Sequence, residues 1–64
     1  MKKQYYQIMS KQTGLTLAMI MAGSMLQALT ELAKQKGYDT WEAYRDCVGI
    51  IKVDFDGFQR VYLT

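Results

Sequence analysis

Residues 15–29 read L-T-L-A-M-I-M-A-G-S-M-L-Q-A-L, an uncharged and largely apolar run at the centre of a 64-residue chain. Taken whole, the run has the length of about four helical turns. Divided, it gives a strand over residues 15–21, a break at Ala22-Gly23-Ser24 and a helix that begins at Met25. We favour the division, because Ser24 followed three residues later by Gln27 fits a helix-capping box. The division predicts an α+β protein rather than a helical one.

The segment before the break predicts a β-hairpin. Residues 4–9 are rich in strand formers, and Gly14 can supply the positive φ that closes a loop over residues 10–14. In the strand 15–21 the odd positions are Leu15, Leu17, Met19 and Met21, and the even positions are Thr16, Ala18 and Ile20. Both sets are largely apolar, which predicts helices over one face and an oligomer partner or a target over the other.

Two capped helices follow the break. Apolar residues recur with helical periodicity over residues 25–36, and Gly37 suits the left-handed position that ends a helix. A shorter helix over residues 41–48 begins after a cap at Asp39 or Thr40 and ends at Gly49. Its spacing places Trp41, Tyr44 and Val48 on one stripe, and we expect Glu42 to pair with Arg45 on the outer side.

A second hairpin is predicted at the end of the chain. Strand-like residues 50–55 and 58–63 flank Asp56-Gly57, a strong signal for a two-residue turn. Such a turn would place three opposed pairs on one face: Phe55 with Phe58, Val53 with Arg60, and Ile51 with Tyr62. A one-residue bulge would exchange the faces of the last strand. The expected order is β-β-α-α-β-β in a single domain over residues 1–64, a small antiparallel sheet with both helices on one face.

Composition narrows the classes of function. Half of the residues are hydrophobic and 22% are charged, which is typical of a globular protein. A chain this short buries only ~60% of its unfolded surface, so we expect self-association or partner binding to support it. The absence of histidine excludes histidine-containing zinc sites and histidine acid–base pairs, and one cysteine, Cys47, permits no intrachain disulfide. We interpret Cys47 as a thiol at the edge of the core in a reducing, cytoplasmic setting.

Neither a membrane span nor a signal peptide is expected. A span needs ~20 consecutive apolar residues, and the run 15–29 is shorter and interrupted by polar residues and a glycine. Its polar leader is long, and no small-x-small cleavage site follows it.

No pattern predicts catalysis, a cofactor or a metal. Glu31 and the acidic residues of the short helix, Asp39, Glu42 and Asp46, resemble a solvated surface rather than two carboxyls converging in a cleft. Asp54-Phe55-Asp56-Gly57 has the start of a calcium loop but lacks its other ligands and its closing glutamate, so we interpret it as a turn. The chain is therefore predicted to be non-enzymatic.

Aromatic and basic residues are the candidates for binding a partner. Aromatic side chains are enriched at the centres of protein interfaces. Tyr5 and Tyr6 point to opposite faces of a strand, so at least one of them should be exposed. Lys2, Lys3 and Lys11 stand in a first half that has no acidic residue before Glu31. The predicted partner-binding residues are Tyr5, Tyr6, Lys11, Ile20, Phe58, Arg60 and Tyr62.

Two resemblances bear on function. Residues 25–46 are similar to the two helices of ribbon-helix-helix repressors, with Leu29, Leu32, Ala33, Gly37, Tyr38, Glu42, Ala43, Arg45 and Asp46 at matching positions. That resemblance implies a DNA-reading strand at residues 15–21, where only Thr16 offers a hydrogen-bond donor for base edges.

The strand hairpin, the capped helix and the run G-Y-D-T-W-E-A-Y at residues 37–44 resemble small phage and mobile-element proteins, several of which block host complexes such as CRISPR effectors. The first hypothesis is therefore a cytoplasmic protein-binding module of the phage inhibitor type, with a homodimer as a further expectation. The alternative is a ribbon-helix-helix repressor that binds DNA.

Overall fold

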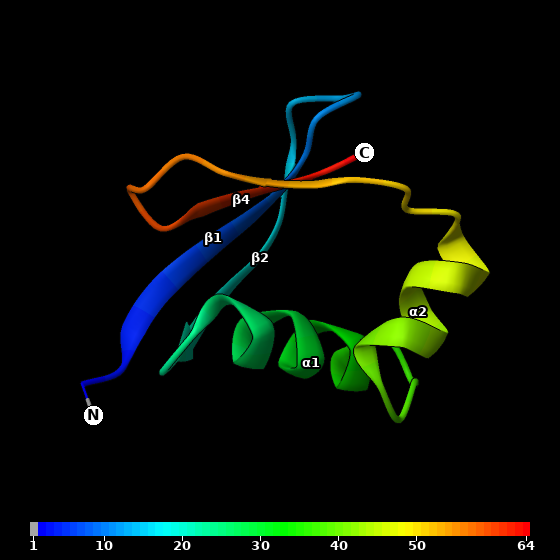
Figure 1. Ribbon diagram of the computed structural model, residues 1–64, viewed down its shortest axis with the longest axis horizontal. Helices are drawn as coiled ribbons and strands as arrows, with labels where there is room; N and C mark the ends of the chain where they lie inside the picture. The colour runs from blue at the N-terminus through cyan, green and yellow to red at the C-terminus, as the bar shows by residue number, and fades with distance from the viewer. Residues whose placement is uncertain (1) are drawn as a thin grey trace.

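The computed structural model describes residues 2–64, and within them a four-stranded sheet and two helices (Figure 1). The elements in chain order are β1 (Gln4–Ser10), β2 (Thr16–Ala22), α1 (Met25–Gln35), α2 (Trp41–Val48), β3 (Val53–Phe55) and β4 (Arg60–Leu63). The α+β class and the order β-β-α-α-β-β are confirmed.

The sheet has the order β2-β1-β4-β3 and is mixed rather than purely antiparallel. β1 pairs antiparallel with β2, and β3 pairs antiparallel with β4, but β1 and β4 run parallel. A parallel pair needs a crossover connection of a dozen or more residues, usually a helix. The segment that contains α1 and α2 supplies this connection. The prediction of an all-antiparallel sheet was therefore wrong, because it considered only neighbouring hairpins.

The first hairpin forms as predicted, with one irregularity. The Ser10 N–H donates to the Leu15 carbonyl over 2.9 Å, and Gly14 adopts a φ of 73°. The register shifts between Ile8, which lies opposite Ala18, and Met9, which lies opposite Thr16. Residue 17 is thus an extra residue in β2, a β-bulge.

The bulge changes which residues of β2 share a face. The Thr16 hydroxyl accepts a 2.8 Å hydrogen bond from Nε2 of Gln7, and Gln7 lies opposite Met19. Thr16 therefore shares a face with Met19, whereas strict alternation predicted that it would share one with Ile20. The buried residues Ile20 and Ala22 keep the alternation beyond the bulge.

The cap at Ser24 divides the central apolar run. Ser24 has an extended backbone, with φ −156° and ψ 165°, and its Oγ accepts the Gln27 N–H over 3.2 Å. The Gln27 side chain reaches back as predicted, but its Oε1 accepts the N–H of Gly23, one residue before the cap, over 2.9 Å. A side chain on Gly23 would stand 3.0 Å from this oxygen, so the lack of a Cβ makes room for the contact. α1 then continues to Gln35, and Gly37 follows with a φ of 91°.

In α2 the cap is Thr40, whose hydroxyl accepts the Ala43 N–H over 3.1 Å. Gly49 ends the helix with a φ of 82°. Two details differ from the prediction. Val48 is 54% exposed and does not continue the buried stripe of Trp41 and Tyr44, because the chain turns away there. Arg45 pairs with its neighbour Asp46 over 3.2 Å.

The second hairpin has a longer loop than the predicted two-residue turn. Val53 lies opposite Leu63, Asp54 opposite Tyr62 and Phe55 opposite Val61, and residues 56–59 connect the strands. Residues 50–52 precede the strand instead of belonging to it. This register buries Val61 and Leu63, whereas the predicted one would have placed Arg60 on the face of Val53. The burial of apolar side chains in place of a cation decides the register.

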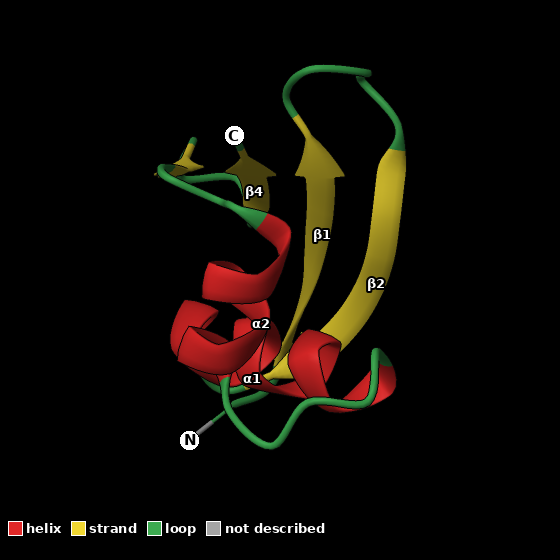
Figure 2. Cartoon of the chain, turned by 90° about the vertical axis from the view of Figure 1, so that its right-hand side faces the viewer, coloured by secondary structure: helices red, strands yellow, loops and turns green. Residues whose placement is uncertain are grey.

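One hydrophobic core joins the helices to alternate residues of the strands. Its buried members are Tyr6, Ile8, Ile20, Ala22, Ala28, Leu29, Leu32, Ala33, Trp41, Tyr44, Val61 and Leu63. α1 packs against β1, β2 and α2, and Figure 2 shows α1 and α2 close together beside the lower part of the strands. Tyr38 and Tyr44 meet edge to face with ring centroids 5.3 Å apart, and Tyr6 lies 6.1 Å from Phe55.

We predict that Leu32→Ala lowers the free energy of unfolding by about 2–5 kcal/mol, because the side chain is fully buried and its removal leaves a cavity. Leu26→Ala on the same helix is the matched control. Leu26 is 59% exposed, so the change should stay within about 0.5 kcal/mol. Urea unfolding followed by circular dichroism measures both, and equal effects would contradict this description of the core.

Candidate interaction surface

The strand residues that alternate with the core positions form a second, uncovered surface, which we call the open face. Its members are Tyr5, Gln7, Met19, Met21, Arg60 and Tyr62, together with Phe58 from the loop before β4. Tyr5 lies opposite Met21, and Gln7 lies between Met19 and Arg60. Tyr5 is 56% exposed, Met19 58% and Phe58 76%. Each of these three side chains exposes more than half of its surface.

A shallow hollow of about 310 Å³ lies on the open face between Tyr5, Met19, Phe58 and Arg60. The loop that carries Phe58 is attached to β1 at two points. The Gln59 carbonyl accepts the Gln7 N–H over 2.8 Å, and Nε2 of Gln59 donates to Oε1 of Gln4 over 2.8 Å. Gln59 adopts a φ of 66° at this place. The hollow is thus built by β1, β2 and the loop together.

The structure brings several of the predicted partner-binding residues onto this surface. Tyr5, Phe58 and Arg60 line the hollow, and Tyr62 lies further along the same face, opposite Met9. Lys11 follows the end of β1 and contacts Asp54 of β3.

Two predicted partner-binding residues lie in the core instead. Tyr6 and Ile20 oppose each other in the β1–β2 ladder and are 7% and 5% exposed. Their side chains therefore leave almost no surface for a partner. The residue that the sequence prediction missed is Met19. The alternation of β2 could have identified it, because an inward Ile20 places its neighbour on the outer face.

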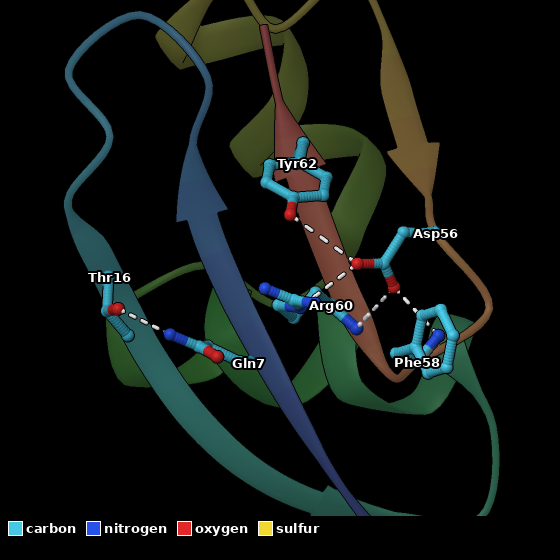
Figure 3. A network of polar contacts seen from close by, with 6 residues as sticks. All are labelled: Gln7, Thr16, Asp56, Phe58, Arg60 and Tyr62. Atoms are coloured by element: carbon cyan, nitrogen blue, oxygen red, sulfur yellow. Dashed lines mark hydrogen bonds and ion pairs between the residues drawn. The ribbon is translucent and has the colours of Figure 1, made fainter.

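Asp56 organises the loop between β3 and β4 (Figure 3). Its Oδ1 accepts the N–H of Phe58 over 2.8 Å and that of Arg60 over 3.3 Å. Its Oδ2 forms an ion pair with Nε of Arg60 over 3.0 Å and accepts a hydrogen bond from the Tyr62 hydroxyl over 3.5 Å. Desolvation acts to raise the pKa of Asp56, but the hydrogen bonds and the nearby cation outweigh it and hold the pKa below 3.8.

Asp54 lies between two lysines. Lys11 Nζ is 3.0 Å from Oδ2, and Lys52 Nζ is 3.4 Å from Oδ1. The hydrogen bond from Lys11 is the main reason that the pKa of Asp54 lies below 3.8. Both carboxylates beside the open face are therefore neutralised by cations. By contrast, Lys2 and Lys3 have no ion-pair partner among residues 2–64.

A larger open hollow of about 460 Å³ lies between Lys11, Lys52, Asp54 and Tyr62. Its two carboxylates already have partners: Asp54 pairs with Lys11 and Lys52, and Asp56 pairs with Arg60 and accepts a hydrogen bond from the Tyr62 hydroxyl. Within residues 2–64, no three histidine, cysteine, aspartate or glutamate side chains come together in a way that could hold a metal ion. The contacts here join strands and loops, and they brace the open face from one side.

Cys47 is exposed on α2, outside the core. Its Sγ accepts a hydrogen bond from the Tyr38 hydroxyl over 3.0 Å, and this contact raises the pKa of Tyr38 above 10.0. The pair ties α2 to the segment that precedes it. It lies away from the residues of the open face.

Comparison with known proteins adds no relative: no protein-family model, no curated protein and no solved structure matches this chain. Neither α1 nor α2, the helices described within residues 2–64, is long and apolar enough to cross a membrane.

The two lowered pKa values give a test of these contacts. Because both folded-state values lie below 3.8, the stability from these carboxylates is fully present above that pH and is lost as the pH falls through the folded-state values. We predict that Arg60→Gln raises the pKa of Asp56 towards 3.8, since the variant removes the nearby cation. Asp54 is the internal control, because Lys11 holds it, and carbon-detected NMR titration measures both. Equal shifts at both residues would contradict the assignment.

Proposed function

We propose that this chain is a non-enzymatic protein-binding module, and that its open face docks on an apolar patch bordered by carboxylates on a partner protein. In its most specific form, the module is a cytoplasmic inhibitor of the phage type that blocks a host defence complex or a nucleic-acid-processing complex. The observation that carries the proposal is the group of exposed side chains around the hollow, Tyr5, Met19 and Phe58.

The chemistry of the hollow supports a protein partner. Tyrosine, phenylalanine and methionine are enriched in the buried centres of protein interfaces, and arginine is a frequent companion. Here Arg60 keeps one contact to Asp56, so its charge is balanced and the centre of the surface is close to neutral. A neutral apolar centre contributes binding energy through desolvation.

The lysines at the border of the open face are the reason for proposing carboxylates on the partner. Lys2 and Lys3 precede β1 and are exposed, and Lys3 lines a hollow with Met21. The chain has a formal net charge of +2. Unpaired cations beside an apolar centre favour a partner whose rim is acidic, mainly through the rate of association.

The alternative is the DNA-binding repressor. The outward residues of β2 beyond the bulge are the apolar Met19 and Met21, and the amide of Gln7, opposite Met19, donates one of its hydrogen bonds to Thr16. Few groups remain there to read base edges. The two functions differ in salt dependence, because phosphate contacts make affinity fall steeply with salt, whereas an apolar interface responds weakly.

We predict that the wild-type chain inhibits DNA cleavage by at least one complex in a panel of purified CRISPR effector complexes. Tyr5→Ala and Phe58→Ala should each weaken this inhibition about 30-fold. The factor corresponds to about 2 kcal/mol for an aromatic side chain at the centre of an interface. Ile51→Ala is the matched control, because Ile51 is 87% exposed but lies outside the open face.

Two outcomes would contradict the proposal. One is an equal loss of inhibition in Ile51→Ala. The other is a shift of duplex DNA at moderate salt that alanine at Lys2, Lys3 and Lys11 abolishes, which would identify the repressor instead.

A further inference from the structure

The sheet ends on one side in β2, an edge strand of seven residues. We infer that this edge pairs antiparallel with β2 of a second copy of the chain, with Ile20 on the two-fold axis. The two sheets then form one continuous eight-stranded sheet. The inference rests on the backbone of β2 and stands apart from the proposed partner-binding function.

The hydrogen bonds of β1 show which backbone groups of β2 are free. The Gln7 N–H donates to Gln59 on the β4 side, over 2.8 Å, so it faces away from β2. Met19, the residue opposite Gln7, therefore forms a non-hydrogen-bonded pair with it. In such a pair the N–H and C=O of each residue point outward. The same groups of Met21, two residues further along the strand, also point outward to the edge.

The other edge of the sheet is protected, and β2 is not. β3 has only three residues, and its central residue, Asp54, is bridged by Lys11 and Lys52. Short length and charged side chains are the usual means by which proteins prevent edge strands from pairing. β2 has neither feature, and its bulge at residue 17 lies outside residues 18–22. No charged residue occurs between Lys11 and Glu31, and no proline occurs in the chain.

The free groups determine what can cover this edge. Alternating N–H and C=O groups are satisfied together only by another extended backbone. β2 itself carries no charged side chain, so two copies of the strand bring no like charges into the ladder. A two-fold arrangement also lets each copy supply the same patch, as in most homodimers.

The free groups of Met19 and Met21 select the register. With Ile20 on the axis, Met19 lies opposite Met21 of the second copy, and each such pair exchanges two N–H···O bonds. Both pairs avoid the bulge at residue 17. The four methionine side chains then lie together on the open face. Met19 and Met21 are 58% and 48% exposed in the single chain, so this contact removes apolar surface from water.

The size of the contact sets the expected affinity. A specific interface buries ~800 Å² on each partner, which is roughly a fifth of the 4356 Å² that this chain exposes. The paired segment, residues 18–22, is about 16 Å long. Even with Leu26 beside it, 59% exposed on α1, the interface falls at the low end of the range. We therefore expect a dimer with a Kd of about micromolar order.

Sedimentation equilibrium from about 1 µM to about 1 mM tests the dimer. The wild-type chain should dimerise, and Met19→Pro should raise the Kd at least about tenfold, because proline removes an outward N–H that makes no bond within the chain. Met19→Ala is the matched control, since it removes the same side chain but keeps the N–H, and it should remain dimeric. A wild-type chain that is monomeric throughout, or equal effects of the two substitutions, would overturn the inference.

Amide exchange in the wild-type chain gives a test that does not depend on whether the proline variant folds. Raising the protein concentration through the dimerisation range should slow exchange of the Met19 and Met21 amides at least about tenfold. Phe55 provides the control. The N–H of its neighbour Asp56 donates to the Arg60 carbonyl, so the Phe55 N–H faces outward on the protected edge, which is β3. Exchange at Met19 and Met21 that does not depend on concentration, or that slows equally at Phe55, would overturn the inference.

Discussion

The fold depends on the cap at Gly23, Ser24 and Gln27. Two hydrogen bonds, from the Gln27 N–H to Ser24 Oγ and from the Gly23 N–H to Gln27 Oε1, end one secondary structure and begin another within a continuous apolar run. An apolar run of this composition supports a strand or a helix equally well. The extended backbone of Ser24 satisfies a first-turn N–H of α1 and stops the helix from extending back into β2.

The position of the cap has consequences for the whole sheet. Because α1 begins directly after β2, α1 and α2 carry the chain from one edge of the sheet to β3 at the other edge. The hairpin between β3 and β4 then places β4 beside β1 in a parallel sense. β4 then occupies the centre of the sheet with β1, and β2 and β3 become its edges. The two edges differ in length and charge. Asp56 holds the loop before β4 in the conformation that goes with this register, in which Val61 and Leu63, rather than Arg60, reach the core.

The surface properties follow from the size of the protein. A single sheet with two short helices can cover its apolar strand residues on one face only, and the core of this chain takes the positions of Tyr6, Ile8 and Ile20. Their neighbours in the strands remain exposed. The open face and the free edge of β2 meet at Met19, whose backbone belongs to the edge and whose side chain lies where the two surfaces adjoin. A partner protein and a second copy could therefore occupy adjoining surfaces without competing for the same backbone groups.

Local chemistry in the sequence determined the elements, their caps and the division at Ser24, because each depends on residues within a few positions of one another. The cap at Ser24 and the positive φ angles of Gly14, Gly37 and Gly49 could be predicted in this way, and the second cap could be narrowed to Asp39 or Thr40, of which the structure uses Thr40. Strand alternation places Tyr5 and Tyr6 on opposite faces of the sheet. It does not determine which of the two is buried.

The tertiary structure alone decided which of Tyr5 and Tyr6 is buried. It also decided the parallel pairing of β1 with β4, the bulge at residue 17 and the register between β3 and β4. The parallel pairing depends on segments far apart in the chain. The bulge and the second register lie within hairpins, and the burial of Val61 and Leu63 in preference to Arg60 selects among hairpin registers that the local sequence leaves equivalent.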